Sequence, residues 1–232
     1  MKLSIIIPAY NEQENIADII NSMAELMDIP YELVIINDHS VDNTAKIAGE
    51  LSRGLENIKL VENRLERGFA NAIRTGFKNA TGDVVIPVMA DLCDDLRTIK
   101  LMLGKINEGY DIVCGSRYIK GGVRLGGPGI KRILSYLGGI SLHCLLGLPT
   151  SDIANSFKMY RKDIVDGIDI KSGGFEISME IVLRAYYLGF KITEVPTAWK
   201  ERTKGKSSFK VLRLLPAYIK LYIWGIVKKI CG

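Results

Sequence analysis

Short apolar runs alternate with amphipathic segments along most of this 232-residue chain. Runs of about four to eight β-branched or aliphatic residues between turn residues indicate buried strands, and apolar residues at helical spacing indicate helices. We therefore predict strands at Leu3–Ile7, Tyr31–Ile36, Ile58–Val61, Val84–Met89, Asp111–Cys114 and Lys191–Val195. The predicted helices are Ile16–Met27, Ala45–Leu51, Gly68–Lys78, Leu96–Asn107, Phe175–Leu188 and Ser207–Lys229. This alternation predicts an α/β fold with a mainly parallel sheet and helices on both faces.

Polar residues precede two of the predicted helices. Asn11 can cap the first helix, with Glu14 completing a capping box. Asp94 and Asp95 precede Leu96–Asn107, where they can cap the helix or supply oxygen ligands to a metal. The pattern favours capping for this pair and leaves the metal role open.

The interval after the fifth predicted strand is basic and rich in glycine. Between residues 115 and 129 there are six glycines, and no acid occurs between residues 111 and 152. The basic residues of the interval are Arg117, Lys120, Arg124, Lys131 and Arg132. A segment of this composition, without helical or strand periodicity, predicts a mobile loop that grips an anion, with a solvated linker as the alternative.

Positive charge is concentrated late in the sequence. The whole chain carries a net charge of +5, but residues 199–232 contain nine Lys or Arg against one acid and so carry +8. A basic segment on a near-neutral body favours an anionic surface as partner. We expect an anionic membrane surface and no nucleic acid.

The predicted helix Ser207–Lys229 has an apolar and a largely basic side. The apolar stripe consists of Leu212, Leu215, Ile219, Tyr222 and Ile226, and the opposite stripe of Lys210, Arg213, Ala217, Lys220, Trp224 and Lys228. We predict a domain at residues 1–206 followed by an amphipathic, membrane-apposed helix at 207–232. The alternative is that the apolar stripe packs on the chain's own core or on a second copy.

The sequence also indicates the cellular compartment of the protein. It opens without a signal peptide pattern, and no uncharged apolar stretch reaches the ~18–20 residues of a spanning helix. The four cysteines form no C-x-x-C pair, which indicates reduced thiols. We expect a cytoplasmic protein attached peripherally to the cytoplasmic face of a membrane.

Three predicted strands end in polar residues. Tyr10 and Glu12 follow the first strand, Asp38 the second, and Asp91 the fourth. Carboxyl ends of neighbouring parallel strands form the ligand-binding edge of an open α/β sheet. Carboxylates there suit Mg²⁺ or Mn²⁺, which would in turn hold a diphosphate. The glycine fingerprints of dinucleotide-binding folds and P-loops are absent, so we expect a nucleotide held by carboxylates and a metal.

Nine motifs in order along the chain carry a family resemblance. They are IIIPAYNEQENI, INDHSVDNT, RGFANAIRTGF, VMADL, GSRY, KRILS, DIANSFKMYRK, EIVLRAYYLGFKITEVP and ERTKGKSS. Together they resemble the family 2 glycosyltransferases of GT-A fold, a Rossmann-like three-layer sandwich. The later motifs look like the dolichol-phosphate mannose synthase branch, which transfers a sugar to a polyprenyl phosphate.

The resemblance implies roles for individual residues. The nucleotide-sugar would contact Pro8, Ala9, Tyr10, Glu12, Asp38, Gly68 and Ala90. The acceptor phosphate would contact Arg117, Lys131, Arg132 and Ser135. Asp91 would hold the metal that bridges the diphosphate, and Arg202 would approach that diphosphate. Asp152 is implied among the catalytic residues as a support of the acceptor loop, with helix capping as the alternative.

The chain also departs from the family pattern. Met89 stands where the family usually has the first aspartate of D-A-D, and Cys93 stands where it has glutamine. Lys131 replaces the usual acceptor arginine, and Ala154-Asn155-Ser156-Phe157 replaces Thr-Ser-Gly-Phe. The metal site therefore has fewer carboxylate ligands than usual in the family, and Asp94 or Asp95 could compensate.

The expected activity is that of an inverting, metal-dependent hexosyltransferase. The resemblance implies transfer from GDP-mannose or UDP-glucose to a polyprenyl phosphate, with mannose preferred. One alternative is a saccharide or glycolipid acceptor, which would require a base such as Asp152 or Asp94. The other is a catalytically inactive nucleotide-binding partner of a membrane complex.

Overall fold

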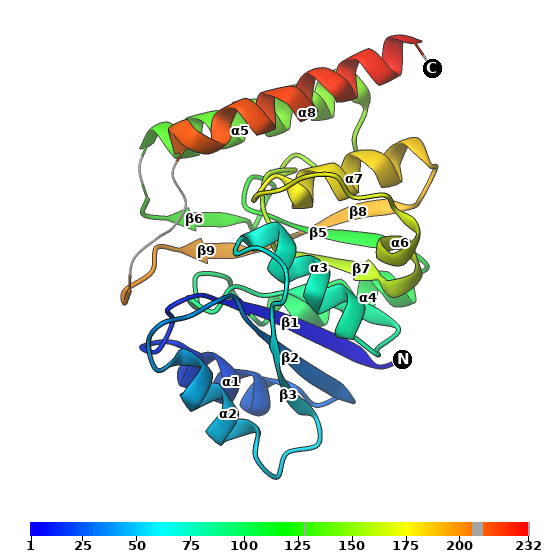
Figure 1. The fold of residues 1–232 in the computed structure, drawn as a ribbon. Coiled ribbons are helices and arrows are strands. Elements are labelled where there is room, and N and C mark those ends of the chain that lie inside the picture. Colours follow the sequence, from blue (N-terminus) through cyan, green and yellow to red (C-terminus); the bar gives the residue numbers. More distant parts are fainter. Residues whose placement is uncertain (128, 206–210, 232) are drawn as a thin grey trace.

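The computed structural model describes residues 1–127, 129–205 and 211–231. Within these ranges a seven-stranded sheet in the order β3-β2-β1-β4-β7-β5-β8 forms the middle layer (Figure 1). Its strands are β1 (Leu3–Ala9), β2 (Tyr31–Asn37), β3 (Ile58–Glu62), β4 (Val84–Pro87), β5 (Ile112–Ser116), β7 (Lys158–Arg161) and β8 (Ile192–Pro196). Neighbouring strands run parallel except at β7, which is antiparallel to both β4 and β5.

Helices cover both faces of this sheet and complete a three-layer sandwich (Figure 1). Helices α1 (Ile16–Leu26), α2 (Thr44–Ser52) and α4 (Thr98–Asn107) cover one face, and α3 (Phe69–Asn79), α6 (Lys162–Gly167) and α7 (Ile177–Tyr187) the other. Successive side chains of a strand point to opposite faces, so Ile5 and Ile7 enter one core and Ile6 the other. The predicted α/β fold with a mainly parallel sheet is confirmed.

The structure contains two short strands and a long helix that the sequence pattern does not predict. Strand β6 (Val123–Leu125) pairs in parallel with β9 (Ala198–Lys200) in a separate two-stranded sheet, and helix α5 (Gly129–Leu146) follows β6. The interval predicted to be a mobile loop is therefore partly structured. Three-residue strands are too short to show a period of two, which explains why the pattern misses them.

The predicted capping box of the first helix is wrong. Asn15 occupies the N-cap of α1. Asn11 has a left-handed backbone with φ 54°, and its Oδ1 accepts a hydrogen bond from the Val41 amide at 2.9 Å. Asn11 therefore stabilises the turn after β1 and leaves Glu14 without the predicted capping partner.

The two acids predicted to cap the next helix differ in role. Helix α4 begins at Thr98, whose amide donates to the Asp95 carbonyl at 3.0 Å. The Asp95 carboxylate accepts hydrogen bonds from the amide and side chain of Arg97. Asp95 thus supports the turn that leads into α4, whereas Asp94 is buried and belongs to the site described below.

Helices α5 and α8 (Val211–Cys231) lie side by side on the outside of the molecule, along the top of Figure 1. Their outward apolar side chains are Ile130, Ile133, Leu134, Leu137 and Leu145 of α5 and Ile219, Ile223, Val227 and Ile230 of α8. The two helices contain six Lys or Arg and no Asp or Glu. We call this surface the α5–α8 face.

The residues predicted to form the apolar stripe of the last helix lie partly against the core and partly in solvent. Tyr222 and Ile226 pack against the core, whereas Ile219 is 47% exposed. Trp224, predicted on the basic stripe, instead packs edge-on against Tyr187 of α7. Two residues of the predicted stripes, Lys210 and Leu212, lie outside the described side chains. No helix within the described ranges has the length and apolar character needed to cross a membrane.

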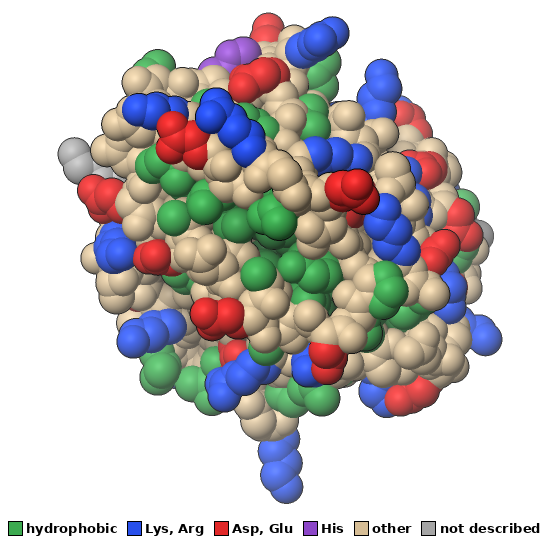
Figure 2. Space-filling model, turned by 90° about the horizontal axis from the view of Figure 1, so that it is seen from below, with side chains coloured by type: hydrophobic (Ala, Val, Ile, Leu, Met, Phe, Trp, Pro, Cys, Tyr) green, Lys and Arg blue, Asp and Glu red, His purple; other side chains and the backbone are tan. Residues whose placement is uncertain are grey.

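The opposite side of the molecule has a different surface. Seen from below, it carries Lys, Arg, Asp and Glu side chains interspersed around a central area of apolar atoms (Figure 2). Acidic side chains are thus part of this surface, whereas α5 and α8 contain none.

Candidate functional site

The carboxyl ends of β1, β2 and β4 meet at one edge of the sheet. Strand β1 lies between β2 and β4, so the segments that follow these strands are neighbours. Each segment contains a residue other than glycine with a left-handed backbone: Asn11 (φ 54°), His39 (φ 62°) and Leu92 (φ 56°). Such conformations cost on the order of 1–3 kcal/mol and cluster at functional sites. The backbone therefore marks this edge as a candidate functional site.

Asp38 links two other predicted nucleotide-binding residues. Its carboxylate, on a side chain that is almost fully buried, accepts hydrogen bonds from Asn63 Nδ2 at 2.7 Å and from the Gly68 amide at 3.0 Å. Its own amide donates to the Ala9 carbonyl at 2.8 Å. The structure thus brings Ala9, Asp38 and Gly68 together beside the end of β1.

Tyr10 provides an aromatic surface at the same edge. Arg67 donates to the Tyr10 hydroxyl at 2.7 Å, and its guanidinium carbon lies 4.7 Å from the ring centre. Arg67 is a site residue that the sequence analysis misses, although it lies next to Gly68. The side chains of Pro8 and Ala90 are buried in the core, so these two residues can reach a ligand only through their backbone.

Arg202 joins the ends of β1 and β4. Its Nη2 donates to both carboxylate oxygens of Glu12, at 2.6 and 2.9 Å, and its Nε lies 3.7 Å from Asp91 Oδ2. Glu12 also accepts from Asn15 Nδ2 at 2.7 Å. Three residues predicted separately for the nucleotide, the metal and the diphosphate therefore form one charged group.

The acidic side chain of Asp94 is buried close to Asp91. Burial and the nearby Asp91 charge together raise the pKa of Asp94 to about 7, against the opposing charge of Arg117. Burial and the Asp91 charge also raise the pKa of the Cys93 thiol far above its usual range, which keeps it a neutral, unreactive thiol. The Cys93 amide donates to Asp91 Oδ1 at 3.2 Å and fixes that carboxylate.

Asp91 is the residue here that could hold a metal ion. Among the described residues, no group of three or more His, Cys, Asp or Glu side chains is arranged to bind one. Mg²⁺ needs only one or two carboxylates when substrate phosphates supply further oxygens. The Asp91 side chain is 18% exposed, so its carboxylate is partly accessible to a ligand. This oxygen set fits a hard divalent cation that arrives with a diphosphate.

Arg117 and Asp152 form a buried ion pair beside this group. Arg117 donates to both carboxylate oxygens of Asp152, at 2.7 and 2.8 Å, and Nη2 reaches Ser135 Oγ at 3.2 Å. Asp152 is 0% exposed, so it cannot contact a substrate as the catalytic or base residue considered above. Its position is that of a residue that orients Arg117.

A buried lysine supports the loop that carries Asp152. Lys158 in β7 is fully buried, and its Nζ donates to the carbonyls of Ile153 and Asn155. Burial lowers the pKa of Lys158 to about 8. The Asn155 amide group in turn donates to the Gly115 carbonyl at 2.8 Å. Sequence reasoning misses Lys158 because a lysine is normally assigned to the surface.

Lys131 lies close to Arg117 and Arg124, and we call these three residues the basic group. Burial lowers the pKa of Lys131, and the positive charges of Arg124 and Arg117 lower it further. Lys131, Ser135 and Arg117 are therefore brought together as predicted, whereas the neighbouring Arg132 is exposed on α5.

Strand β9 connects the Asp91 loop with the basic group. The Asp95 amide donates to the Ala198 carbonyl at 3.0 Å, and the Lys200 amide donates to the Cys93 carbonyl at 2.8 Å. On its other edge β9 pairs with β6, where Arg124 and Trp199 are register partners. β9 therefore fixes the two halves of the site relative to each other.

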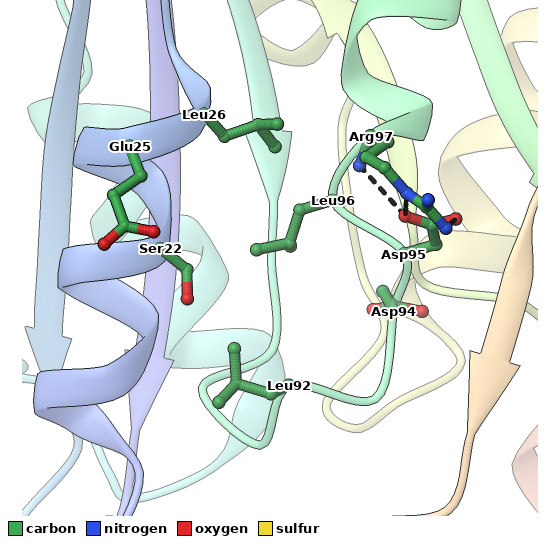
Figure 3. Close-up of a pocket in the computed structure, with 8 residues that line it drawn as sticks. All are labelled: Ser22, Glu25, Leu26, Leu92, Asp94, Asp95, Leu96 and Arg97. Atoms are coloured by element: carbon green, nitrogen blue, oxygen red, sulfur yellow. Dashed lines mark hydrogen bonds and ion pairs between the residues drawn. The ribbon is translucent and has the colours of Figure 1, made fainter.

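A shallow cleft behind the Asp91 loop lies outside this arrangement. Figure 3 shows Ser22, Glu25 and Leu26 of α1 on one side and the 94–97 turn on the other, with Leu92 and Leu96 between them. Asp95 and Arg97 are paired with each other on the far side. Asp94 of the site also lines this cleft, but none of the residues predicted to bind the nucleotide-sugar or the acceptor phosphate does, so we do not assign it to the substrates.

Comparison with known proteins identifies relatives over most of the chain. The family described as Glycosyl transferase family 2 matches residues 4–168. A dolichol-phosphate mannosyltransferase of Pyrococcus furiosus is 35% identical over 215 residues, covering 90% of this chain and 60% of that protein. A polyprenol monophosphomannose synthase of Mycolicibacterium smegmatis is 27% identical over 229 residues, covering 96% of this chain and 86% of that protein. The chain thus spans less than two thirds of the Pyrococcus protein.

Solved structures share the fold at low sequence identity. Glucosyl-3-phosphoglycerate synthase from Mycobacterium tuberculosis in complex with UDP superposes with a TM-score of 0.73 at 15% identity, covering 97% of this chain and 80% of that chain. Its complex with Mn²⁺, UDP-glucose and phosphoglyceric acid gives a TM-score of 0.71 at 16% identity, with 98% and 79% covered. At this identity the similarity supports the three-layer fold alone.

Proposed function

Because the chain belongs to glycosyl transferase family 2, we propose that it transfers a hexose from a nucleotide-diphosphate sugar to a polyprenyl phosphate with inversion at the anomeric carbon. The observation that carries this proposal is that Arg117 and Lys131 of the basic group, together with Ser135, lie next to the carboxylates of Glu12 and Asp91. The printed names of the two curated relatives support mannose as the sugar and a polyprenyl phosphate as the acceptor.

The donor would occupy the edge formed by β1, β2 and β4. Tyr10 offers its ring to the base, and the Asp38–Gly68 pair lies where the nucleoside would sit. Asp91 would hold Mg²⁺ or Mn²⁺ against the diphosphate, and the bound cation would neutralise charge on that group. Arg202 would leave Glu12 for the diphosphate, since its planar fork suits phosphate oxygens. GDP-mannose is the preferred donor, with UDP-glucose as the other candidate.

The chemistry of the acceptor fits the residues present. An oxygen of the lipid phosphate attacks the anomeric carbon, the bond from that carbon to the diphosphate breaks, and the nucleoside diphosphate leaves. A phosphate monoester is already anionic at neutral pH, so the step needs positioning and charge neutralisation instead of a strong base. The burial of Asp152 against Arg117 agrees with this, because Asp152 cannot serve as a base for a neutral hydroxyl.

The α5–α8 face supports a peripheral position on the cytoplasmic side of a membrane. Its exposed apolar side chains and its six basic residues suit an anionic bilayer surface. A polyprenyl substrate also requires a site close to the bilayer. Lys131 and Ser135 both lie on α5. Helix α5 therefore contributes to this face and also to the surroundings of Arg117.

A donor panel tests the proposed function. GDP- and UDP-sugars are incubated with the protein, Mg²⁺ or Mn²⁺, and either polyprenyl phosphate or a saccharide, and nucleoside diphosphate release and lipid-linked sugar are measured. We expect release that depends on polyprenyl phosphate, greatest with GDP-mannose. Release only with the saccharide would favour the saccharide acceptor, and donor binding without any release would favour an inactive partner protein.

A further inference from the structure

Lys158 of β7 is a lysine without contact with solvent. Its side chain is fully buried, and its Nζ donates to the Ile153 carbonyl at 2.8 Å and to the Asn155 carbonyl. Within the described ranges, no carboxylate forms a hydrogen bond or an ion pair with this ammonium. Lysine is rarely buried without a paired charge, because removing an ammonium from water is costly. That cost indicates that Lys158 does more than fill space in the core.

The segment that Lys158 holds begins with Asp152. The Asn155 amide donates to the Asp152 carbonyl at 3.2 Å, so residues 152–155 form a turn. The Asn155 side chain donates to the Gly115 carbonyl at 2.8 Å, and the Asp152 amide donates to Thr150 Oγ1 at 3.2 Å. The two carbonyls bonded to Lys158 belong to the second and fourth residues of this turn. Lys158 therefore fixes the turn that carries Asp152.

Asp152 in turn fixes Arg117. Its carboxylate accepts from Nε and Nη2 of Arg117 at 2.7 and 2.8 Å and from the Arg117 amide at 3.0 Å. Nη2 of Arg117 also reaches Ser135 Oγ at 3.2 Å. Because only 9% of the Arg117 side chain is exposed, a small displacement of Asp152 would move the donors that a phosphate can reach. Displacements of about 1 Å are enough to weaken oriented contacts strongly.

The charged and titratable side chains around Lys158 include this ion pair. They are Arg117, Asp152, Cys114 of β5, which is the register partner of Lys158, and Glu194 of β8, which is the register partner of Cys114. Burial lowers the pKa of Lys158 to about 8, against the opposing charge of Asp152. Burial raises the pKa of the Cys114 thiol to about 11, and arginine does not deprotonate in proteins. Mildly alkaline solution therefore removes the charge of Lys158 and leaves Cys114 and Arg117 unchanged.

We propose that Lys158 is a positioning residue for the acceptor, because its ammonium holds the Asp152 turn in the place from which Asp152 orients Arg117 toward the acceptor phosphate. This proposal rests on the proposed function for the nature of the acceptor. Arg117, Lys131 and Ser135 remain the residues that contact the phosphate. Lys158 touches no substrate, since its side chain is fully buried.

Binding of two ligands to Lys158→Met tests the proposal. Methionine keeps the length of the side chain and removes its charge and donors. Titration calorimetry of the full-length protein measures the Kd of farnesyl phosphate and, separately, of GDP and UDP with Mg²⁺. The variant should bind farnesyl phosphate roughly three- to thirtyfold more weakly and bind the nucleotides like the parent. Lys162→Met removes the first lysine of α6, which pairs with Asp166 at the surface, and should bind both kinds of ligand like the parent.

The pH dependence of binding to the parent gives a second test, which decides the matter if Lys158→Met does not fold. Farnesyl phosphate stays a dianion between pH 7 and pH 9.5, since the second pKa of a phosphate monoester is about 6. Affinity should fall about three- to tenfold over this range with a midpoint near 8, because the uncharged amine is a weaker donor to the two carbonyls. Lys131 and Asp94 also have shifted pKa values, so the profile is repeated with Lys131→Arg and with Asp94→Asn. The decline should persist in both variants and be absent from Lys158→Met.

Other outcomes would overturn the role of Lys158. A Lys158→Met protein that binds farnesyl phosphate like the parent would show that the turn needs no ammonium, and equal weakening of both kinds of ligand would show a general structural effect. A decline that disappears in Lys131→Arg or in Asp94→Asn would belong to the replaced residue. A parent that does not bind farnesyl phosphate would overturn this proposal together with the proposed function. A parent that binds it but transfers no sugar to polyprenyl phosphate would refute the proposed function alone, and the binding data would still decide the role of Lys158.

Discussion

At the scale of single residues, the site consists of charged groups that are paired with one another within the chain. Arg202 is paired with Glu12 and Asp91, and Arg117 with Asp152. A diphosphate or a phosphate must therefore compete with carboxylates for the same donors. Under the proposed function, the affinity for the nucleotide-sugar would depend on how well a divalent cation replaces Arg202 beside Asp91.

The sequence predicts which residues gather here better than it predicts their contacts. Glu12 and Asp91 converge as expected, because strand order determines where strand ends lie, and Arg202 joins them as the family resemblance implies. Lys158 escapes prediction, since its role comes from burial in the core. No local pattern encodes that property.

Asp91→Ala should abolish sugar transfer while the protein stays folded. Loss of the main carboxylate ligand of a diphosphate-bound cation should cost several kcal/mol of transition-state stabilisation, roughly a thousandfold or more in rate. Turnover with excess Mn²⁺ and a thermal melt measure the two effects. The control is Asp95→Asn, whose carboxylate is paired with Arg97 at the surface and which should remain active. Activity of Asp91→Ala within a few-fold of the parent would place the metal elsewhere.

At the scale of elements, a strand with a long apolar run is predicted from the sequence, whereas a very short strand is not. Strands β1 and β2 are nearly continuous apolar segments buried on both faces, as expected for the centre of a parallel sheet. β6 and β9 are held by backbone pairing and by the Arg124–Trp199 contact, so their sequences show no alternation. Packing partners, which sequence alone does not reveal, determine these short elements.

Two adjacent glycines of α5 make the packing of this helix testable. A Cβ at Gly139 would lie 2.2 Å from the Ser151 carbonyl, whereas a Cβ at Gly138 would have no neighbour within 4 Å among the described residues. Gly139→Ala should therefore destabilise the protein by about 1–3 kcal/mol. Gly138→Ala should stabilise it by up to about 1 kcal/mol, because alanine favours the helix. Urea unfolding of both variants measures the difference, and equal effects would contradict the close contact of α5 with the Asp152 loop.

Glu32 of β2 should make stability depend on pH. Burial alone would raise its pKa, but hydrogen bonds from Ser4 and Thr81 and the charge of Lys59 outweigh that and hold the pKa at about 2. In the unfolded chain Glu32 titrates near its ordinary value, so it contributes about 3 kcal/mol above pH 4.5. This contribution is lost as the pH falls from about 4.5 towards 2.

Unfolding of Glu32→Gln as a function of pH tests this expectation. The variant should be less stable than the parent at pH 7, and the gap should close at acidic pH. Glu50→Gln alters an exposed residue of α2 and should follow the parent at all pH values. A gap that stays constant from pH 7 to pH 3 would show that Glu32 acts through packing and not through its charge.

At the scale of the whole molecule, the α5–α8 face should dock on anionic membranes. Ile219→Ser combined with Ile223→Ser removes two outward side chains, 47% and 54% exposed, from α8 without touching its packed side. The pair should reduce sedimentation with vesicles containing phosphatidylglycerol and leave donor binding intact. Leu55→Ser with Leu101→Ser, also exposed but outside α5 and α8, should sediment like the parent.

Two results would contradict the membrane role of this face. One is a serine pair that sediments like the parent. The other is equal binding of the parent to vesicles of neutral phosphatidylcholine, since the six basic residues should favour anionic lipid. Point variants are preferable to removal of α8, because Tyr222 and Trp224 pack against the core.

The ion pair between Arg202 and Glu12 has a consequence for biosynthesis. The two residues are 190 positions apart, and Asp91 between them shares the same guanidinium. A nascent chain on the ribosome can form β1, β2 and β4 long before residue 202 has been translated, and in that interval Glu12 and Asp91 repel each other without their countercharge. With a nucleotide sugar as the proposed donor, we expect translation products that end before residue 202 not to bind it.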